Sequence, residues 1–162
     1  MHQRGFTLVE LVVAIAIMGV LFTIGAISLT NSQVDARDRE RLGDIENIAR
    51  SLESYYTANN GSYPATTIMN TETLQTTTLT GINSSSYRAP SVSTDTSLFV
   101  ATTATPTTAG ILPLPTTSRY TYQPIASDGT LCDTTTKECR TYNLYYFDER
   151  SSSVTQYAGK NK

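Results

Sequence analysis

The side chains that most often carry enzyme chemistry are scarce in this sequence. Its 162 residues include one histidine, two cysteines and no tryptophan, and the histidine, His2, lies beside the start of the chain. Catalytic dyads with histidine and histidine-containing zinc sites therefore have almost no material to be built from. The formal net charge of −2 argues against a strongly basic nucleic-acid binder, because a phosphate backbone attracts a surplus of lysine and arginine. We expect no catalytic residue, no metal ligand and no cofactor.

The polar group that most needs a chemical explanation is the carboxylate of Glu10. It lies in an apolar run that continues through 24 uncharged residues, 11–34, which have the length and polarity of a membrane-spanning helix. A carboxylate at the centre of such a helix costs about 2.5–3.5 kcal/mol on insertion scales and is by default a functional candidate. The alternative is an ordinary signal anchor in which Glu10 reaches the cytoplasmic interface. A cleaved secretory signal fits less well, because the apolar run is long and a charged helical pattern follows it.

The residues around Glu10 form a recognisable pattern. Met1-His-Gln-Arg-Gly5 is followed by Phe6-Thr-Leu-Val-Glu10, which closely resembles the processing motif of type IV prepilins and the related pseudopilins. The resemblance implies that a membrane-embedded prepilin peptidase cleaves between Gly5 and Phe6, and that the new amine of Phe6 is methylated. It covers about the first 64 residues, as far as Asn60-Gly-Ser-Tyr-Pro64.

The same resemblance implies partners and two locations. The precursor would be a single-pass protein of the inner (cytoplasmic) membrane, surrounded by lipid. An assembly ATPase and an inner-membrane platform protein would then pack it, with other pilins, into a homo-oligomeric helical filament. That filament would be an extracellular pilus on the cell surface, where a host surface or DNA are further candidate partners.

Glu10 has a specific role in this interpretation. We predict that it pairs with the Phe6 ammonium of a neighbouring subunit and sets the axial register of the filament, because opposite charges stranded in hydrocarbon attract strongly. Phe6 and Glu10 are also four residues apart on one helix, so a contact within one chain is the alternative. Gly19 and Gly25 interrupt the apolar helix, either for close packing between helices or as a weak point that unwinds in the filament.

Residues 34–60 predict the amphipathic half of the same helix. Apolar residues recur at spacings of three and four along it, at Leu42, Ile45, Ile48, Ala49, Leu52, Tyr55 and Tyr56. We expect the charged residues of the other positions to form a solvated or subunit-facing surface, among them Arg37, Glu40, Arg41 and Asp44. Asn59-Asn60-Gly61 and Pro64 predict the end of the helix.

Residues 61–162 predict a small head. The segment 59–118 has three charged residues and 25 serines or threonines among its 60 residues, which predicts long surface loops with a few short strands. Leu98-Phe99-Val100 and Ile111-Leu112 are its predicted anchors to a core. Strands are predicted at Tyr120-Thr-Tyr122, from Arg140 to Phe147 and from Val154 to Tyr157. An antiparallel sheet of these strands would pack on the apolar stripe of the helix, as in pilins.

Cys132 and Cys139 enclose six residues. In a segment outside the cytoplasm we expect them to form a disulfide, which contributes about 2.5 kcal/mol by closing a loop between strands. Nearby acids could supply oxygen ligands, and major pseudopilins of type II secretion bind calcium near their C-terminal end. The spacing matches no EF-hand, and solvated loop acids are the alternative for these five residues: Asp128, Asp133, Glu138, Asp148 and Glu149.

The prediction is therefore an α+β, type IV pilin-like protein in which a long N-terminal helix packs on a small antiparallel sheet. Its parts are a leader peptide (1–5), a transmembrane and assembly segment (6–33), an amphipathic segment (34–60) and an extracellular head (61–162). The predicted function is that of a structural pilin supporting twitching motility, surface adhesion or DNA uptake. Two alternatives stay open: a pseudopilin of a type II secretion system or competence pseudopilus, and a minor tip pilin or membrane-anchored binding module. An enzyme is not expected.

Overall fold

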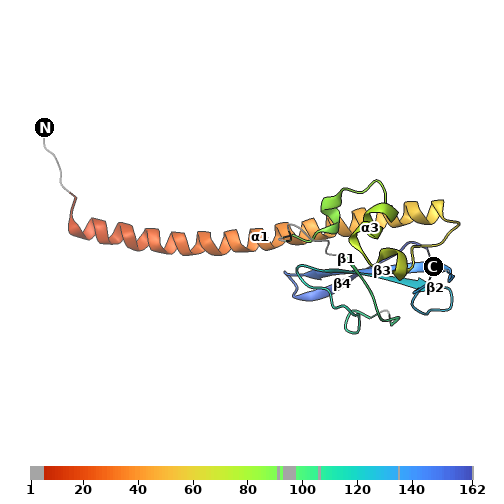
Figure 1. Cartoon of the computed structure of the whole chain (residues 1–162). Helices are drawn as coiled ribbons and strands as arrows, with labels where there is room; N and C mark the ends of the chain where they lie inside the picture. The colour runs from red at the N-terminus through yellow and green to blue at the C-terminus, as the bar shows by residue number, and fades with distance from the viewer. Residues whose placement is uncertain (1–5, 91, 93–97, 106, 135, 162) are drawn as a thin grey trace. The chain divides into compact units, whose positions relative to one another are not determined.

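The computed structural model describes the chain except for residues 1–5, 91, 93–97, 106, 135 and 162 (Figure 1). Its elements in chain order are helices α1 (Leu8–Ala58), α2 (Thr66–Met69) and α3 (Glu72–Thr78), the 3₁₀ helix η1 (Ser84–Tyr87), and strands β1 (Leu98–Val100), β2 (Tyr120–Ala126), β3 (Cys139–Asp148) and β4 (Ser153–Ala158). The chain divides into two compact units, Met1–Ala36 and Arg37–Lys162. We call them the apolar unit and the head unit and describe each by itself; α1 contributes to both.

The four strands of the head unit form one mixed sheet in the order β1-β2-β3-β4. The three C-terminal strands are antiparallel neighbours, as predicted, with Thr121 opposite Tyr145 and Leu144 opposite Tyr157. Strand β1 adds to this antiparallel group in parallel, with Leu98 opposite Tyr120. The α+β class is confirmed, and the arrangement is consistent with a pilin-like fold.

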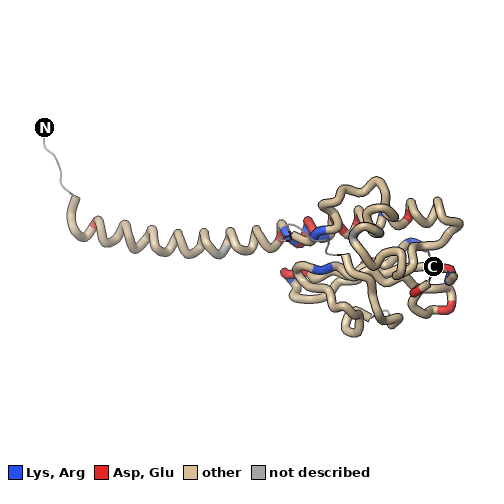
Figure 2. The backbone as a smooth tube through the Cα atoms, viewed as in Figure 1, with Lys and Arg blue, Asp and Glu red and all other residues tan. Residues whose placement is uncertain are grey.

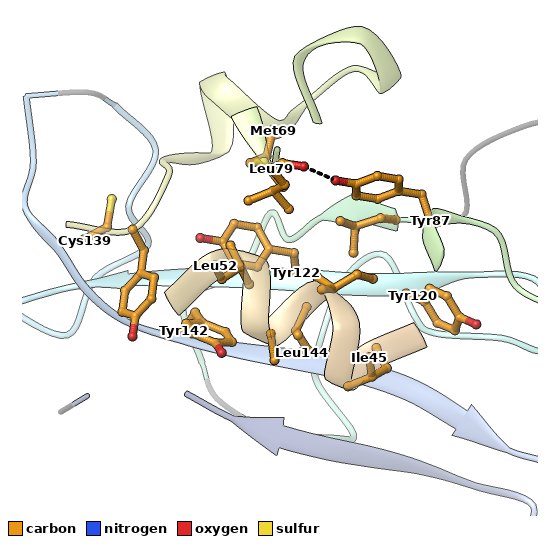
Figure 3. Close-up of a cluster of buried hydrophobic side chains, with 14 of the residues drawn as sticks. Ile45, Leu52, Met69, Leu79, Tyr87, Tyr120, Tyr122, Cys139, Tyr142 and Leu144 are labelled. Atoms are coloured by element: carbon orange, nitrogen blue, oxygen red, sulfur yellow. Dashed lines mark hydrogen bonds between the residues drawn. The ribbon is translucent and has the colours of Figure 1, made fainter. Parts of the chain in front are cut away.

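One face of the sheet buries the head-unit part of α1 (Figure 3). Ile45, Ile48 and Leu52 of α1 have no exposed surface, and they share a cluster with Tyr122 of β2 and Leu144 of β3. Truncating one such aliphatic side chain to alanine typically costs about 2–5 kcal/mol, so this cluster accounts for much of the stability of the head unit.

Tyrosines dominate the cluster, and their buried hydroxyls have hydrogen-bond partners. Tyr122 donates to the carbonyl of Pro64 at 2.8 Å. Tyr142 donates to Oε1 of Glu53 at 3.1 Å, and Tyr63 donates to the same carboxylate at 3.0 Å. Burial without a partner would cost each hydroxyl about 1–3 kcal/mol, so these bonds also select one packing of α1 on the sheet.

The opposite face of the sheet is covered by the threonine-rich segment that follows β1. Gln123 is fully buried there and donates Nε2 to the carbonyl oxygens of Thr103 at 2.9 Å and Thr105 at 3.2 Å. Its Oε1 accepts from Asn143 Nδ2 at 2.9 Å and from the Tyr145 hydroxyl at 3.0 Å. One glutamine therefore connects the sheet to the segment that covers it.

The end of α1 agrees with the turn residues of the sequence. The helix ends at Ala58, and Asn60 and Gly61 then take φ values of 54° and 73°. The Gly61 amide donates to the Tyr56 carbonyl at 3.0 Å, which satisfies one of the last helical carbonyls.

The segment between α1 and β2 contains helical turns that composition did not predict. Thr76, Thr77 and Thr78 belong to α3 although threonine is a poor helix former. The buried amide of Gln75 donates to the carbonyls of Met69 and Leu98, both at 2.8 Å, and so holds the turn against the core. Tertiary packing therefore overrides local preference here.

Some predicted core positions are exposed. Leu98 and Ile111 anchor their segments as predicted. Phe99 is 41% exposed because alternate residues of a strand face opposite ways, and Leu112, which lies in a bend, is 54% exposed. On α1, Leu42 is 40% exposed and the neighbouring Arg41 is buried in its place.

The contacts of Gln123 predict that its substitution destabilises the head unit more than substitution of Gln156 in the same sheet. Gln123→Leu removes the acceptor of Asn143 and Tyr145 and the donor to the covering segment, so we expect it to lower the free energy of unfolding by about 2–4 kcal/mol. Gln156→Leu on β4 is the matched control, since that side chain is exposed and donates to Asn143, and it should cost less than about 1 kcal/mol. Urea unfolding of the full chain in bicelles measures both, and equal losses would contradict the role of Gln123.

Candidate functional site

The start of α1 forms a reciprocal cap around Glu10. The Thr7 amide and hydroxyl donate to Glu10 Oε2 at 2.9 and 2.7 Å, and the Glu10 amide donates to the Thr7 hydroxyl at 3.2 Å. This is a capping box, in which residues three apart satisfy amides at a helix start. The Thr7-x-x-Glu10 pattern could have been found in the sequence and was missed.

The apolar unit presents its hydrophobic side chains outward. An 18-residue window of the helix has a mean hydropathy of 2.6, and none of that window is buried within the chain. Leu11, Met18 and Phe22, for example, are 57%, 67% and 78% exposed. The sequence has no charged residue from 11 to 34, and Figure 2 shows a long tan stretch of α1 without red or blue. By length and composition this stretch can cross a membrane.

Gly19 and Gly25 are not required by contacts within the chain. A Cβ atom built at either position has no heavy atom within 4 Å. Glycine at these two positions therefore affects either the packing of other molecules against the helix or the flexibility of the helix backbone. Both interpretations, close helix packing and a weak point, remain predictions.

At the N-terminal end of the head unit, charged residues of α1 bind the turn between β3 and β4. Glu149 accepts from Arg37 Nε at 3.0 Å and Nη2 at 2.6 Å, and it also pairs with Arg41. Asp38 accepts from the backbone amides of Glu149 and Arg150, both at 3.0 Å. We call these five residues the hairpin clamp, because they hold the β-hairpin on the helix.

Arg41 is the buried member of the clamp. Its side chain is 1% exposed, and its guanidinium binds Asp38 Oδ1 at 2.8 Å and the Thr117 carbonyl at 3.0 Å besides Glu149. The expectation of a solvated surface was therefore wrong for Arg41. It was also wrong for Asp44, which is 8% exposed and accepts a 2.8 Å hydrogen bond from the Tyr120 hydroxyl.

The two carboxylates respond to these surroundings in opposite ways. Hydrogen bonds from Arg37, followed by Arg41, lower the pKa of Glu149 to about 2. Burial raises the pKa of Asp44 to about 7, the charge of Glu40 acts in the same direction, and the Tyr120 hydrogen bond only partly opposes them.

The cysteines form the predicted disulfide, and the neighbouring acids have separate partners. Cys132 and Cys139 are bonded, and both are buried. The acids contact nearby groups instead of gathering: Asp128 accepts from Thr130, Asp133 pairs with Lys137, Glu138 with Arg140, and Asp148 accepts from Ser151. Within the described part of the chain, no group of three or more His, Cys, Asp or Glu is placed to hold a metal ion.

Comparison with known families adds a finding at the start of the chain. Residues 1–26 match a family model described as the prokaryotic N-terminal methylation motif. The chain carries a prepilin-type methylation motif. This motif contains Thr7 and Glu10, so the capping box lies inside the matched residues. The motif and the apolar helix together are consistent with membrane anchoring of a precursor.

One curated protein extends the similarity beyond the methylation motif. Over 65 residues the chain is 38% identical to type II secretion system core protein G of Pectobacterium carotovorum subsp. carotovorum. The matched stretch covers 40% of this chain and 41% of that protein, so the chain spans about two fifths of the relative's length. No solved structure matches the chain.

The structure describes two of the three predicted site residues of the methylation motif. Gly5 lies outside the described residues, and Phe6 is described and is 82% exposed. Glu10 accepts hydrogen bonds from Thr7 of its own chain. Cleavage, methylation of Phe6 and the register pair with a neighbouring subunit therefore stay predictions.

The opposite pKa shifts of Asp44 and Glu149 predict how stability depends on pH. Folded Asp44 holds its proton up to about pH 7, whereas the unfolded group releases it near 3.8, so the free energy of unfolding should fall as the pH rises between these values. Glu149 acts in reverse: its contribution is full above about 4.5 and is lost as the pH falls toward 2. The combined contribution of these two carboxylates to stability should therefore peak between about pH 4 and 4.5.

Two substitutions separate these contributions. Asp44→Asn keeps an acceptor for Tyr120 without the charge, and at pH 8 it should stabilise the chain by on the order of 2 kcal/mol. This gain should vanish at pH 4. Glu149→Gln is the counterpart, and it should destabilise at pH 7 and lose that effect near pH 2. Denaturant titrations across this pH range measure both, and a pH-independent effect of Asp44→Asn would contradict the assignment.

Proposed function

We propose that this chain is the structural subunit of a type IV pilus, a filament polymerised through the apolar N-terminal helix. The observation that carries the proposal is the membrane-length helical stretch whose large apolar side chains have no cover within their own chain. A surface of this kind requires lipid or other apolar helices around it. The methylation motif at the same end adds the expected processing step.

The proposal assigns two successive surroundings to the apolar unit. In the precursor, lipid covers it and the head lies outside the cytoplasm, where a disulfide such as Cys132–Cys139 is stable. Prepilin peptidase then cleaves after Gly5, and Phe6 is methylated. The platform protein and the assembly ATPase move the subunit into the filament, where sister helices replace the lipid. The resulting pilus supports twitching motility, surface adhesion or DNA uptake.

Glu10 supplies specificity in this exchange. Lipid tails are about as apolar as leucine side chains, so replacing lipid by helices gives little hydrophobic free energy. A carboxylate that binds the Phe6 ammonium of the next subunit adds a strong, directional interaction in a medium of low dielectric constant. Only one axial offset between two subunits satisfies both charges.

A second candidate is a pseudopilin of a type II secretion system. It is favoured by the 38% identity to core protein G over 65 residues. The assignment of a pilus is retained because the long segment rich in serine and threonine, 59–118, favours a subunit displayed on the cell surface. The two candidates share the membrane precursor, processing and helix packing.

The proposal is tested by intact mass and N-terminal sequencing of protein sheared from the cell surface without reducing agent. We expect a chain that begins at methylated Phe6, is lighter than its reduced form by the two hydrogens of the disulfide, and is abundant in the sheared fraction. A chain that still begins at Met1 and occurs only in membranes would overturn the filament and leave a signal-anchored module. A processed chain that is scarce on the surface, with loss of secreted proteins on gene deletion, would identify the pseudopilin.

The register role of Glu10 has its own prediction. Glu10→Leu should leave cleavage and methylation of Phe6 intact while reducing filament yield by about tenfold or more, because the incoming subunit loses its charge partner. Thr7→Ala is the control, since it removes the hydroxyl contacts of the capping box but keeps the carboxylate. Quantifying sheared pilin measures the yield. Normal assembly of Glu10→Leu, or an equal loss in Thr7→Ala, would refute a register role.

A further inference from the structure

Two adjoining hollows lie on the head unit, between α1 and the residues around the end of α3. The larger has a volume of about 400 Å³ and includes Asn47 and Asn83 in its walls; the smaller has about 210 Å³ and includes Tyr55. Both are lined by Ser51, Ser54 and Thr80. These shared residues make them one groove along the helix, which we call the polar groove.

The polar groove is lined mainly by neutral hydrogen-bonding side chains, with Ile82 and Ala58 as apolar members of its wall. Hydroxyls and amides supply both donors and acceptors, and the described lining residues include no carboxylate, histidine or cysteine. Arg50 is the charged residue in the lining; its side chain is 73% exposed and lies 4.0 Å from the Glu46 carboxylate. This lining suits neither a metal ion nor a polyanion.

The walls of the groove are held in place before any ligand arrives. Asn47 Nδ2 donates to the Ser86 hydroxyl at 3.1 Å, and the Ser51 hydroxyl donates to the Thr80 carbonyl at 3.3 Å. Gly81 then turns the chain with a φ of 82°, and Asn83 caps η1 by accepting from the Ser85 amide at 3.1 Å. A preformed wall lowers the ordering cost of binding.

Two more features indicate the class of ligand. Tyr55 is half-buried and packs against the core, so it offers a fixed aromatic surface beside the hydroxyls. Ser54 is exposed within the groove. A sugar ring combines an apolar face of C–H groups with a rim of hydroxyls that both donate and accept, and this combination matches an aromatic ring beside serine, threonine and asparagine.

We propose that the polar groove binds a neutral oligosaccharide. The larger hollow alone, with about 400 Å³, falls within the range of about 300–1,000 Å³ that small-molecule sites occupy. Packing of another protein subunit fits the lining less well, because the buried centres of protein interfaces are depleted in serine and enriched in large apolar side chains. The site goes beyond the filament role, and an isolated chain carries all of its residues.

The test uses the full chain, ¹⁵N-labelled in phospholipid nanodiscs, titrated with lactose, maltose and N,N′-diacetylchitobiose. We expect at least one of these sugars to shift the amide signals of Ser51, Ser54, Thr80 and Asn83, and to receive saturation transfer from the protein. Ser54→Arg places a long charged side chain in the groove and should weaken this binding by about tenfold or more. Thr57→Arg makes the same change at an exposed helix position that lines neither hollow, and it should bind as the native chain does.

Several results would overturn the site. The proposal is wrong if none of the three sugars shifts any amide signal, or if the shifted signals lie away from the polar groove. It is also wrong if Ser54→Arg binds the sugar as tightly as the native chain does. Unfolding curves of both variants check that the head remains folded, and a folded Ser54→Arg that assembles poorly while no sugar binds would assign the groove to subunit packing instead. Because binding is measured on unassembled chains, its failure is distinguishable from failure of the filament.

Discussion

One helix of this protein must satisfy two different surroundings. The part of α1 in the apolar unit has 24 consecutive residues without charge and exposes large hydrophobic side chains, whereas the part in the head unit is half buried by a sheet. An α-helix can serve both because it satisfies its own backbone hydrogen bonds in lipid as well as in protein. The two parts differ in what covers their apolar side chains. The sheet covers those of the head unit, whereas those of the apolar unit need other molecules around them.

In the head unit, polar groups within the core fix the position of α1 on the sheet. A core rich in tyrosine buries a large apolar area but also carries hydroxyls that must be paired, and here they bind Glu53, Asp44 and the Pro64 carbonyl. Two of these partners lie on α1 itself, so α1 cannot rotate or slide on the sheet without breaking hydrogen bonds. Gln123 does the same for the segment on the opposite face. These hydrogen bonds give the head unit one defined packing, and they depend on one another.

Local sequence patterns predicted the long helix and the antiparallel strands of this fold well, but they did not predict its polar contacts between distant residues. The apolar period of α1, the turn at Asn60 and Gly61 and the three antiparallel strands all follow from residues near one another in the chain. Arg41 does not: its partner Glu149 is 108 residues away, and by sequence alone an arginine beside Asp38 and Glu40 is typical of a solvated helix face. The packing of α3 beside β1 likewise depends on a distant contact, because Gln75 donates to the carbonyl of Leu98, 23 residues away. The methylation motif was evident because it is contiguous, yet the capping role of Thr7 inside it was overlooked.

The capping box changes how the isolated carboxylate of Glu10 should be understood. Both contacts from Thr7 go to a single oxygen, Oε2, while a carboxylate has two oxygens and about four lone-pair positions. Thr7 therefore lowers the cost of holding a charge at the start of an apolar helix without using all of its accepting capacity. The remaining oxygen can accept from an ammonium group on another chain, so capping in the precursor and pairing in a filament are compatible. A leucine at this position would be less costly in lipid but could make neither contact, so the proposed register role would account for a carboxylate here.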